Sequence, residues 1–128
     1  MRQSYRRLAV WEKAMDLVVE AYALARRLPV KERYELAAQI RSAAVSVVAN
    51  IAEGHGRLHA GDFVRSLSIA SGSLRELDTE LQVTVRVRYL TPDDLSGALA
   101  LADEVGRMLA GLIGSVRRNH KLSNSPTL

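Results

Sequence analysis

The sequence contains no cysteine and three prolines, and aromatic residues make up 5% of its 128 positions. Without cysteine the chain has no disulfides, no thiolate nucleophile and no thiolate ligands for zinc or iron–sulfur clusters. The shortage of aromatics leaves aliphatic residues and alanine to fill the core. No apolar run approaches the roughly 20 residues that a membrane span needs, and charges interrupt the start of the chain, unlike in a secretion signal. We therefore expect a cytoplasmic protein with no membrane partner.

The length of 128 residues is that of one domain by the usual range of roughly 100–200 residues. Hydrophobic residues make up 48% of the sequence and charged residues 25%, which is ordinary for a globular protein. The last ten residues, NHKLSNSPTL, are mostly polar and carry no helical pattern. We expect a single domain over residues 1–118 and a disordered tail over residues 119–128.

Apolar residues recur at helical spacing in four segments, approximately 8–27, 31–54, 62–89 and 91–118. Helix-breaking and capping residues mark the limits of these segments. We expect the first helix to end before Pro29 and the second to end at Gly54 and Gly56. We expect Asp62 to be the N-cap of the third helix, and the fourth to start with the run Thr91-Pro92-Asp93-Asp94. No strand pattern and no internal repeat is present. The pattern predicts an all-α fold, an antiparallel up-down-up-down four-helix bundle.

The first of these segments has two adjacent apolar rows instead of one. One row is Leu8, Trp11, Met15, Val18, Tyr22 and Ala25, and the other is Val10, Ala14, Leu17, Ala21, Leu24 and Leu28. A face of this width is larger than one core contact needs. We expect it to be covered on two sides, by the core of the bundle and by a neighbouring subunit.

Positive charge is concentrated in a few parts of the sequence. In an up-down-up-down bundle the N-terminus, the connection between the second and third helices, and the C-terminus lie at one end. The basic residues of this end, which we call the basic end, are Arg2, Arg6, Arg7, Arg57, Arg65, Arg117, Arg118 and Lys121. The only acids there are Glu53 and Asp62, which gives a net charge of +6. Such a surface attracts phosphate backbones, although a solvated surface with no ligand is the alternative.

The second segment carries a polar row on an otherwise apolar helix: Gln39, Ser42, Ser46, Asn50 and Glu53. Buried polar groups without partners are costly, so we expect this row to face Ser73, Glu76 and Glu80 on the third helix. The row then has a structural role, joining the two helices. The alternative is that Asn50 and Glu53 form a ligand-binding or catalytic pair.

The sequence contains no nucleophile–base–acid set, no glycine-rich phosphate loop and no Glu-x-x-His pair of the kind that bundle metal sites use. We therefore expect no catalytic residues, no metal, no cofactor and no enzymatic activity. His55 and His59 have a spacing compatible with metal binding, but they lie in a glycine-rich connection. The alternative is that protonation of these histidines adds positive charge to the basic end at acidic pH.

The stretch Q-I-R-x-A-A-x-S-x-x-x-N-I-A-E-G-x-G-R, residues 39–57, resembles the signature of the 23S-rRNA intervening-sequence protein family. The motif Val10-Trp11-Glu12-Lys13-Ala14 and the third-helix run from Ile69 to Leu77 resemble the same family. The chain departs from the family pattern in having Ser42 in place of arginine, Val48 in place of proline and His55 in place of an aromatic residue.

The resemblance implies a four-helix bundle that assembles into a ring-like homo-oligomer, often a pentamer. It also implies a similarity to the accessory proteins of diversity-generating retroelements, which bind nucleic acid and a reverse transcriptase. Two hypotheses follow. In the first, the chain is an oligomeric scaffold that binds structured RNA or an RNA–cDNA intermediate through the basic end. In the second, it is a self-assembling protein-interaction module that binds no nucleic acid.

Overall fold

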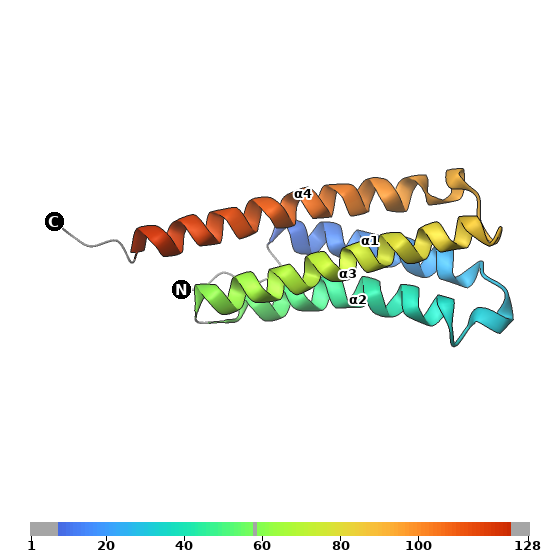
Figure 1. Ribbon diagram of the computed structural model, residues 1–128, viewed down its shortest axis with the longest axis horizontal. Helices are drawn as coiled ribbons and strands as arrows, with labels where there is room; N and C mark the ends of the chain where they lie inside the picture. The colour runs from blue at the N-terminus through green and yellow to red at the C-terminus, as the bar shows by residue number, and fades with distance from the viewer. Residues whose placement is uncertain (1–7, 58, 124–128) are drawn as a thin grey trace.

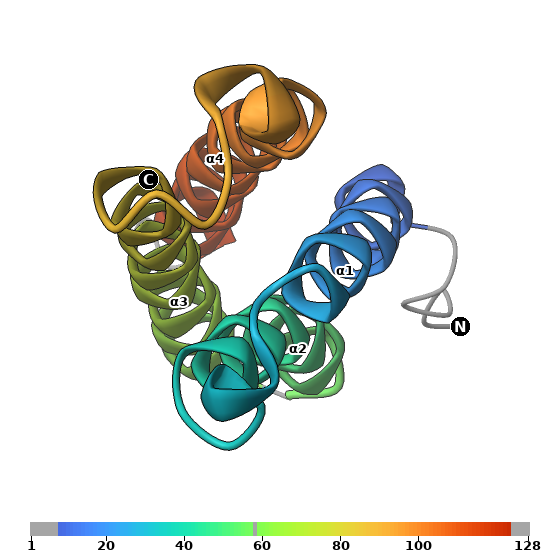
Figure 2. The ribbon, with the colours of Figure 1, turned by 90° about the vertical axis from the view of Figure 1, so that its right-hand side faces the viewer.

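The computed structural model describes residues 8–57 and 59–123, which form four long helices and one short 3-10 helix. These are α1 (Ala9–Arg26), η2 (Val30–Glu32), α2 (Leu36–His55), α3 (Ala60–Arg86) and α4 (Pro92–Ser123). Successive long helices run in opposite directions (Figure 1). Each packs against two neighbours, in the pairs α1–α2, α2–α3, α3–α4 and α4–α1, as the end-on view shows (Figure 2). The predicted antiparallel four-helix bundle is confirmed.

The two apolar rows of α1 have different environments. Val10, Ala14, Leu17, Ala21, Leu24 and Leu28 are buried in the core. In the other row, Trp11, Met15 and Val18 are only partly buried against the core, and Val19 next to them is 66% exposed. One side of α1 therefore faces the interior of the bundle and a second apolar side stays partly open.

Two helix starts differ from the sequence-based expectation. The second helix begins at Leu36 and not near residue 31, because the chain first makes the separate turn η2. The Glu32 carboxylate accepts a hydrogen bond from the Leu36 N–H at 3.4 Å and thus serves the first turn of α2. The third helix begins at Ala60 after His59, so Asp62 lies inside its first turn and is not its N-cap. A carboxylate there still complements the positive end of the helix dipole.

Three helix ends also differ from expectation. Gly54 lies inside α2, which continues to His55, and only Gly56 follows the helix as its C-cap. The third helix ends at Arg86, and Arg88 just after it adopts the left-handed φ of 67°. The fourth helix continues to Ser123, past residue 118, where we expected the domain to end. Residues 124–128 of the predicted tail lie outside the described residues.

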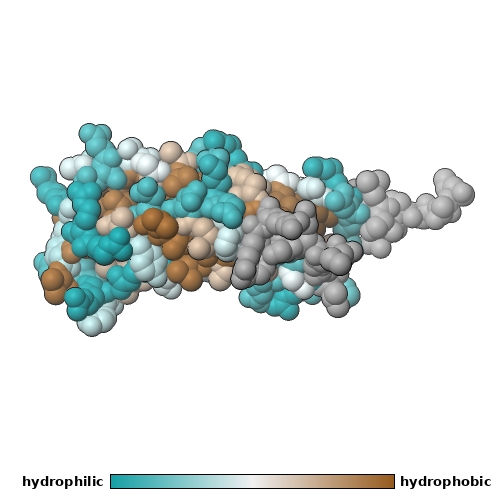
Figure 3. Space-filling view, turned by 180° about the vertical axis from the view of Figure 1, so that it is seen from behind, coloured by the Kyte–Doolittle hydropathy of each residue, from teal (hydrophilic) through white to brown (hydrophobic). Residues whose placement is uncertain are grey.

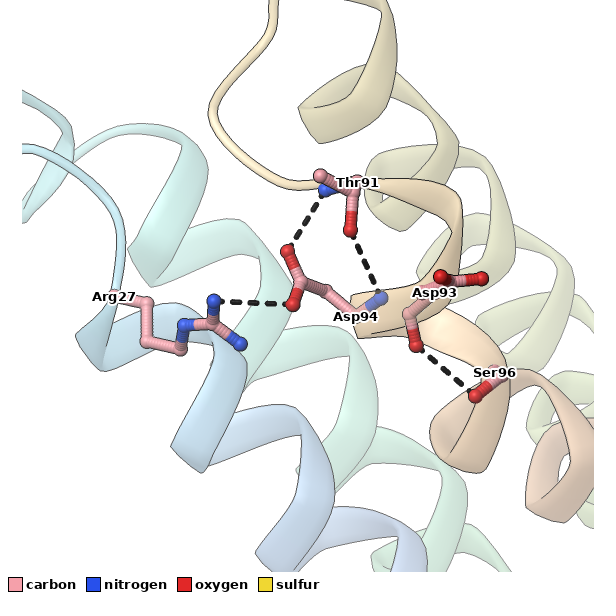
Figure 4. A network of polar contacts seen from close by, with 5 residues as sticks. All are labelled: Arg27, Thr91, Asp93, Asp94 and Ser96. Atoms are coloured by element: carbon pink, nitrogen blue, oxygen red, sulfur yellow. Dashed lines mark hydrogen bonds and ion pairs between the residues drawn. The ribbon is translucent and has the colours of Figure 1, made fainter.

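The start of α4 and its attachment to α1 agree with the expected helix cap (Figure 4). The Asp94 N–H donates to the Thr91 hydroxyl at 3.2 Å, and the Thr91 N–H donates to the Asp94 carboxylate at 2.8 Å. Arg27 at the end of α1 pairs with the same carboxylate at 3.1 Å. The hydrogen bonds from Thr91, assisted by Arg27, hold the pKa of Asp94 below its usual value.

The far end of the bundle is also fastened by Tyr89, in the turn between α3 and α4. Its hydroxyl donates a 2.7 Å hydrogen bond to Glu32 of η2. That bond is the main cause that raises the pKa of the Tyr89 hydroxyl. The two turns at this end are therefore joined to each other by side chains as well as by packing.

The glycine inside α2 allows a very close approach to α3. A Cβ atom added at Gly54 would lie 2.7 Å from the Cβ of Ser66 and 3.0 Å from Phe63, closer than carbon atoms pack in protein interiors. We therefore expect Gly54→Ala to lower the free energy of unfolding by about 1–3 kcal/mol through overpacking, as measured by urea denaturation.

Gly111→Ala is the matched control, because nothing lies within 4 Å of a Cβ at that helical position. It should stabilise the protein by up to about 1 kcal/mol through helix propensity. Equal stabilisation by both substitutions would show that α2 and α3 are not in close contact at Gly54.

Candidate nucleic-acid interface

The basic end forms where the topology predicts it. The start of α1, the connection between α2 and α3, and the end of α4 lie at the same end of the molecule (Figure 1). Arg57, Arg65, Arg117 and Arg118 are all exposed there. Lys121 belongs to the last turns of α4. Arg2, Arg6 and Arg7 lie outside the described residues.

The four exposed arginines are not equivalent. Arg57 pairs with Glu53 one helical turn before it, so part of its charge is compensated within the chain. Arg65 makes no ion pair within residues 8–57 and 59–123. Both arginines line a depression of about 330 Å³ between the end of α2 and the start of α3, together with Asn50, Glu53, Asp62, Ser66 and Ile69.

A second, smaller depression of about 150 Å³ lies between α3 and α4. Arg117 and His120 of α4 line it with Ala60, Gly61 and Val64 of α3. At 100° per residue, Ala60 and Val64 point to a different side of α3 from Asp62 and Arg65, and Gly61 lies between the two sides. The first turns of α3 therefore have an arginine from α4 on one side and the Arg65 depression on the other.

The polar row of α2 is only partly engaged with α3. The Ser46 and Ser73 hydroxyls form a hydrogen bond of 2.7 Å across the two helices. The Asn50 side-chain amide donates to the Ser46 carbonyl at 2.9 Å and to the Ser46 hydroxyl at 3.2 Å. Gln39, Ser42 and Glu53 are exposed. A hydrogen bond thus joins the two helices at Ser46, whereas Asn50 bonds to Ser46 of its own helix. Gln39 and Ser42 form no contact of this kind among the described residues.

On α3 the partner row repeats every seven residues, as Ser66, Ser73 and Glu80, all buried. Glu76, which we expected in the same row, is exposed. Sequence reasoning did not single out Ser66, although the seven-residue spacing from Ser73 would have identified it. Small side chains in this row let α2 and α3 approach closely, at Gly54 in particular.

The exception in the row is Glu80, a carboxyl group that is 8% exposed. Its Oε1 atom is buried without a hydrogen-bond partner among the described residues. Burial raises the pKa of Glu80 from its ordinary 4.5 to about 7, and the carboxylate of Glu76, one turn away, adds to the shift. Below about pH 7 Glu80 is therefore mostly protonated in the folded protein.

The two histidines of the connection have structural surroundings of different kinds. The His55 ring packs edge-on against Phe63, with 5.9 Å between ring centroids. His59 is exposed and precedes α3. No group of three or more metal-ligating side chains occurs within residues 8–57 and 59–123. None of the described helices has the length and apolarity that crossing a membrane requires.

The burial of Glu80 predicts how stability depends on pH. Because the folded-state pKa of about 7 is higher than the ordinary 4.5, the folded state holds a proton that the unfolded state releases between these pH values. The contribution of Glu80 to the free energy of unfolding should therefore fall, by up to about 3 kcal/mol, as pH rises through this window. Urea denaturation at pH 4.5, 6, 7 and 8 measures it.

Glu80→Gln should remove this component and leave a flatter pH profile, because the amide does not ionise. Glu20→Gln, an exposed change on α1, is the control and should keep the slope of the unchanged protein. Identical slopes for the Glu80→Gln variant and the unchanged protein would mean that Glu80 is ionised in the folded state.

The comparisons with known proteins agree with this architecture. The sequence profile of the 23S rRNA-intervening sequence protein family matches residues 6–111. A solved structure from Bacteroides thetaiotaomicron, described as a protein with unknown function from the S23 ribosomal protein family, superposes with a TM-score of 0.74 at 26% identity. The similarity covers 82% of this chain and 98% of that one. No curated protein matches the sequence. With the profile covering most of its length, the chain belongs to the 23S rRNA-intervening sequence protein family.

Proposed function

We propose that this protein is a non-enzymatic, self-associating scaffold that binds structured RNA or an RNA–cDNA intermediate through its basic end. The observation that carries the proposal is that the start of α1, the arginine-bearing connection between α2 and α3, and the arginine-bearing end of α4 lie at one end of the bundle (Figure 1). Arginine predominates there, and its planar guanidinium suits phosphates and stacking on bases. The name of the family, which refers to an rRNA intervening sequence, is consistent with an RNA ligand.

The opposite end of the bundle explains why the basic end is the one that we assign to nucleic acid. There six basic residues and four acids occur over residues 26–35 and 86–94, a net charge of +2 against +6 at the basic end, and Arg27 is paired with Asp94. At the basic end Arg65, Arg117 and Arg118 are exposed and make no ion pair within the described residues. Charges that have no acidic partner in the chain are available to phosphates.

Recognition through this end would depend on RNA shape and backbone. A-form RNA has a deep, narrow major groove that side chains do not read, so a duplex is recognised through its phosphates and 2′-hydroxyls. Backbone contacts by arginine give affinity that falls steeply with salt. The proposed ligand is therefore structured RNA, held by its phosphates.

Self-association is the second part of the proposal. The side of the molecule where α1 lies has apolar surface in its middle, between hydrophilic regions (Figure 3). Trp11, Met15, Val18 and Val19 of α1 contribute to an apolar face that is partly exposed. A pentamer, which the family resemblance implies, would repeat the basic end five times. A reverse transcriptase, also implied by the resemblance, is the protein partner that we propose for such an assembly.

The alternative function is a self-assembling protein-interaction module without nucleic-acid binding. The apolar face of α1 favours it independently, because self-association needs no charge at the basic end. The two functions differ in RNA binding. The scaffold should bind RNA with an affinity that falls with salt, and the interaction module should bind no RNA.

Affinity for a structured RNA, measured by fluorescence anisotropy, should fall linearly with the logarithm of salt concentration. Replacing Arg2, Arg6, Arg7, Arg117 and Arg118 by glutamine should flatten that slope by about one unit for each phosphate that the variant no longer neutralises. A control with Lys31→Gln and Arg86→Gln, both exposed at the opposite end, should keep the slope. Absence of binding at low salt would favour the protein-interaction module.

Self-association should depend on the outer face of α1. Val19→Glu introduces a charge at a position that is 66% exposed, so the bundle should fold normally while the assembly dissociates in sedimentation velocity experiments. Val30→Glu, at a position that is 80% exposed in η2, is the matched control and should leave the assembly intact. Unchanged sedimentation of both variants would place the interface elsewhere.

A further inference from the structure

The depression between the end of α2 and the start of α3 is lined by acidic, amide, hydroxyl and aliphatic side chains as well as by arginines. Its volume is about 330 Å³ and seven residues line it: Asn50, Glu53, Arg57, Asp62, Arg65, Ser66 and Ile69. This volume is at the lower limit of small-molecule sites, about 300 Å³. It is enough for one base and its sugar and too small for a helix.

Three of the lining side chains, Asn50, Glu53 and Asp62, carry hydrogen-bond acceptors. The Asn50 amide nitrogen is already used, since it donates to Ser46 at 2.9 Å and 3.2 Å. Its carbonyl oxygen has no partner among the described residues. Glu53 shares its carboxylate with Arg57, and Asp62 makes no ion pair in the described part of the chain. A ligand that donates hydrogen bonds suits these acceptors.

Three other lining residues add a place for an anion and two surfaces against which a base can pack. Arg65 makes no ion pair within the described residues, so its guanidinium is available to a phosphate. Ile69 is 47% exposed, and an exposed aliphatic side chain can pack against the face of a base. Arg57, held by Glu53, offers a planar guanidinium on which a base can stack.

We propose that this depression binds the base of one unpaired guanosine in an RNA, with the adjoining phosphate on Arg65. The inference rests on the proposed function and deepens it, because it adds a base preference to binding that is otherwise indifferent to sequence. Guanine carries two neighbouring donors, N1–H and the N2 amino group, which match a carboxylate. Adenine and cytosine place a ring acceptor beside their amino group, which a carboxylate repels, and uracil offers one donor.

The test uses the full chain and three RNA hairpins that differ only in one unpaired loop nucleotide: guanosine, inosine or adenosine. Inosine lacks the N2 amino group and keeps N1–H. The guanosine hairpin should bind about tenfold more tightly than the adenosine hairpin, the usual size of a bidentate preference. The inosine hairpin should fall between them. Guanosine monophosphate should compete at the site, which separates the base itself from its RNA context.

Single substitutions in the lining test which residues cause the preference for guanosine. Asp62→Asn and Glu53→Gln should remove the preference for guanosine and keep salt-dependent binding, since both changes leave the arginines in place. Arg65→Ala should weaken binding of all three hairpins equally. Arg75→Ala is the matched control, because Arg75 is an exposed arginine of α3 that does not line this depression, and it should change nothing.

Equal binding of the three hairpins would overturn the guanosine site and leave the proposed function standing. A preference that persists in both carboxylate variants would also overturn it, by placing recognition elsewhere. If no hairpin binds at low salt, the guanosine site and the proposed function both fail.

Discussion

The close contact between α2 and α3 is the constraint on which the arrangement of the candidate interface depends. Gly54 and Ser66 approach so closely that a Cβ on the glycine would lie 2.7 Å from the serine Cβ, and the Ser46 and Ser73 hydroxyls are 2.7 Å apart. Small side chains permit this distance, and the hydrogen bond between Ser46 and Ser73 helps to fix the register of the two helices. The register in turn places Asn50 and Glu53 of α2 beside Asp62 and Arg65 of α3.

The sequence predicted the number of helices, their order and the buried rows, because these follow from apolar spacing over many residues. The motif Thr91 to Asp94 was interpreted correctly because a capping box is a local signal. The start of α2 could not be predicted in this way, since it depends on the Glu32 side chain and on a turn that Tyr89 holds from a distant part of the chain. Gly54 looked like a helix end, and only the position of α3 shows that it serves a close contact.

For the candidate site, spacing grouped Ser46 and Asn50 correctly, but spacing on one helix cannot show which residues of another helix lie opposite. Gln39 and Glu76 were grouped with this interface and are exposed, whereas Ser66 was overlooked and is buried. Arg57 and Arg65 were predicted as basic residues of one end, and the structure adds that acids and an amide share their depression. Charge counting had placed Glu53 and Asp62 at the same end, but it cannot show that they line one depression with Asn50.

Self-association and nucleic-acid binding would use different parts of this molecule. The outer face of α1 is the apolar surface proposed for assembly, and the guanosine site lies between α2 and α3. Among the described residues α1 and α3 do not pack against each other, so a subunit seated on α1 leaves that site open. The symmetry of the assembly then decides how charge accumulates. A twofold antiparallel pair would separate the basic ends, whereas a cyclic ring of parallel subunits would gather them on one face. The parallel arrangement makes one continuous basic surface for a single RNA, so the proposed function favours subunits arranged in parallel around a cyclic axis.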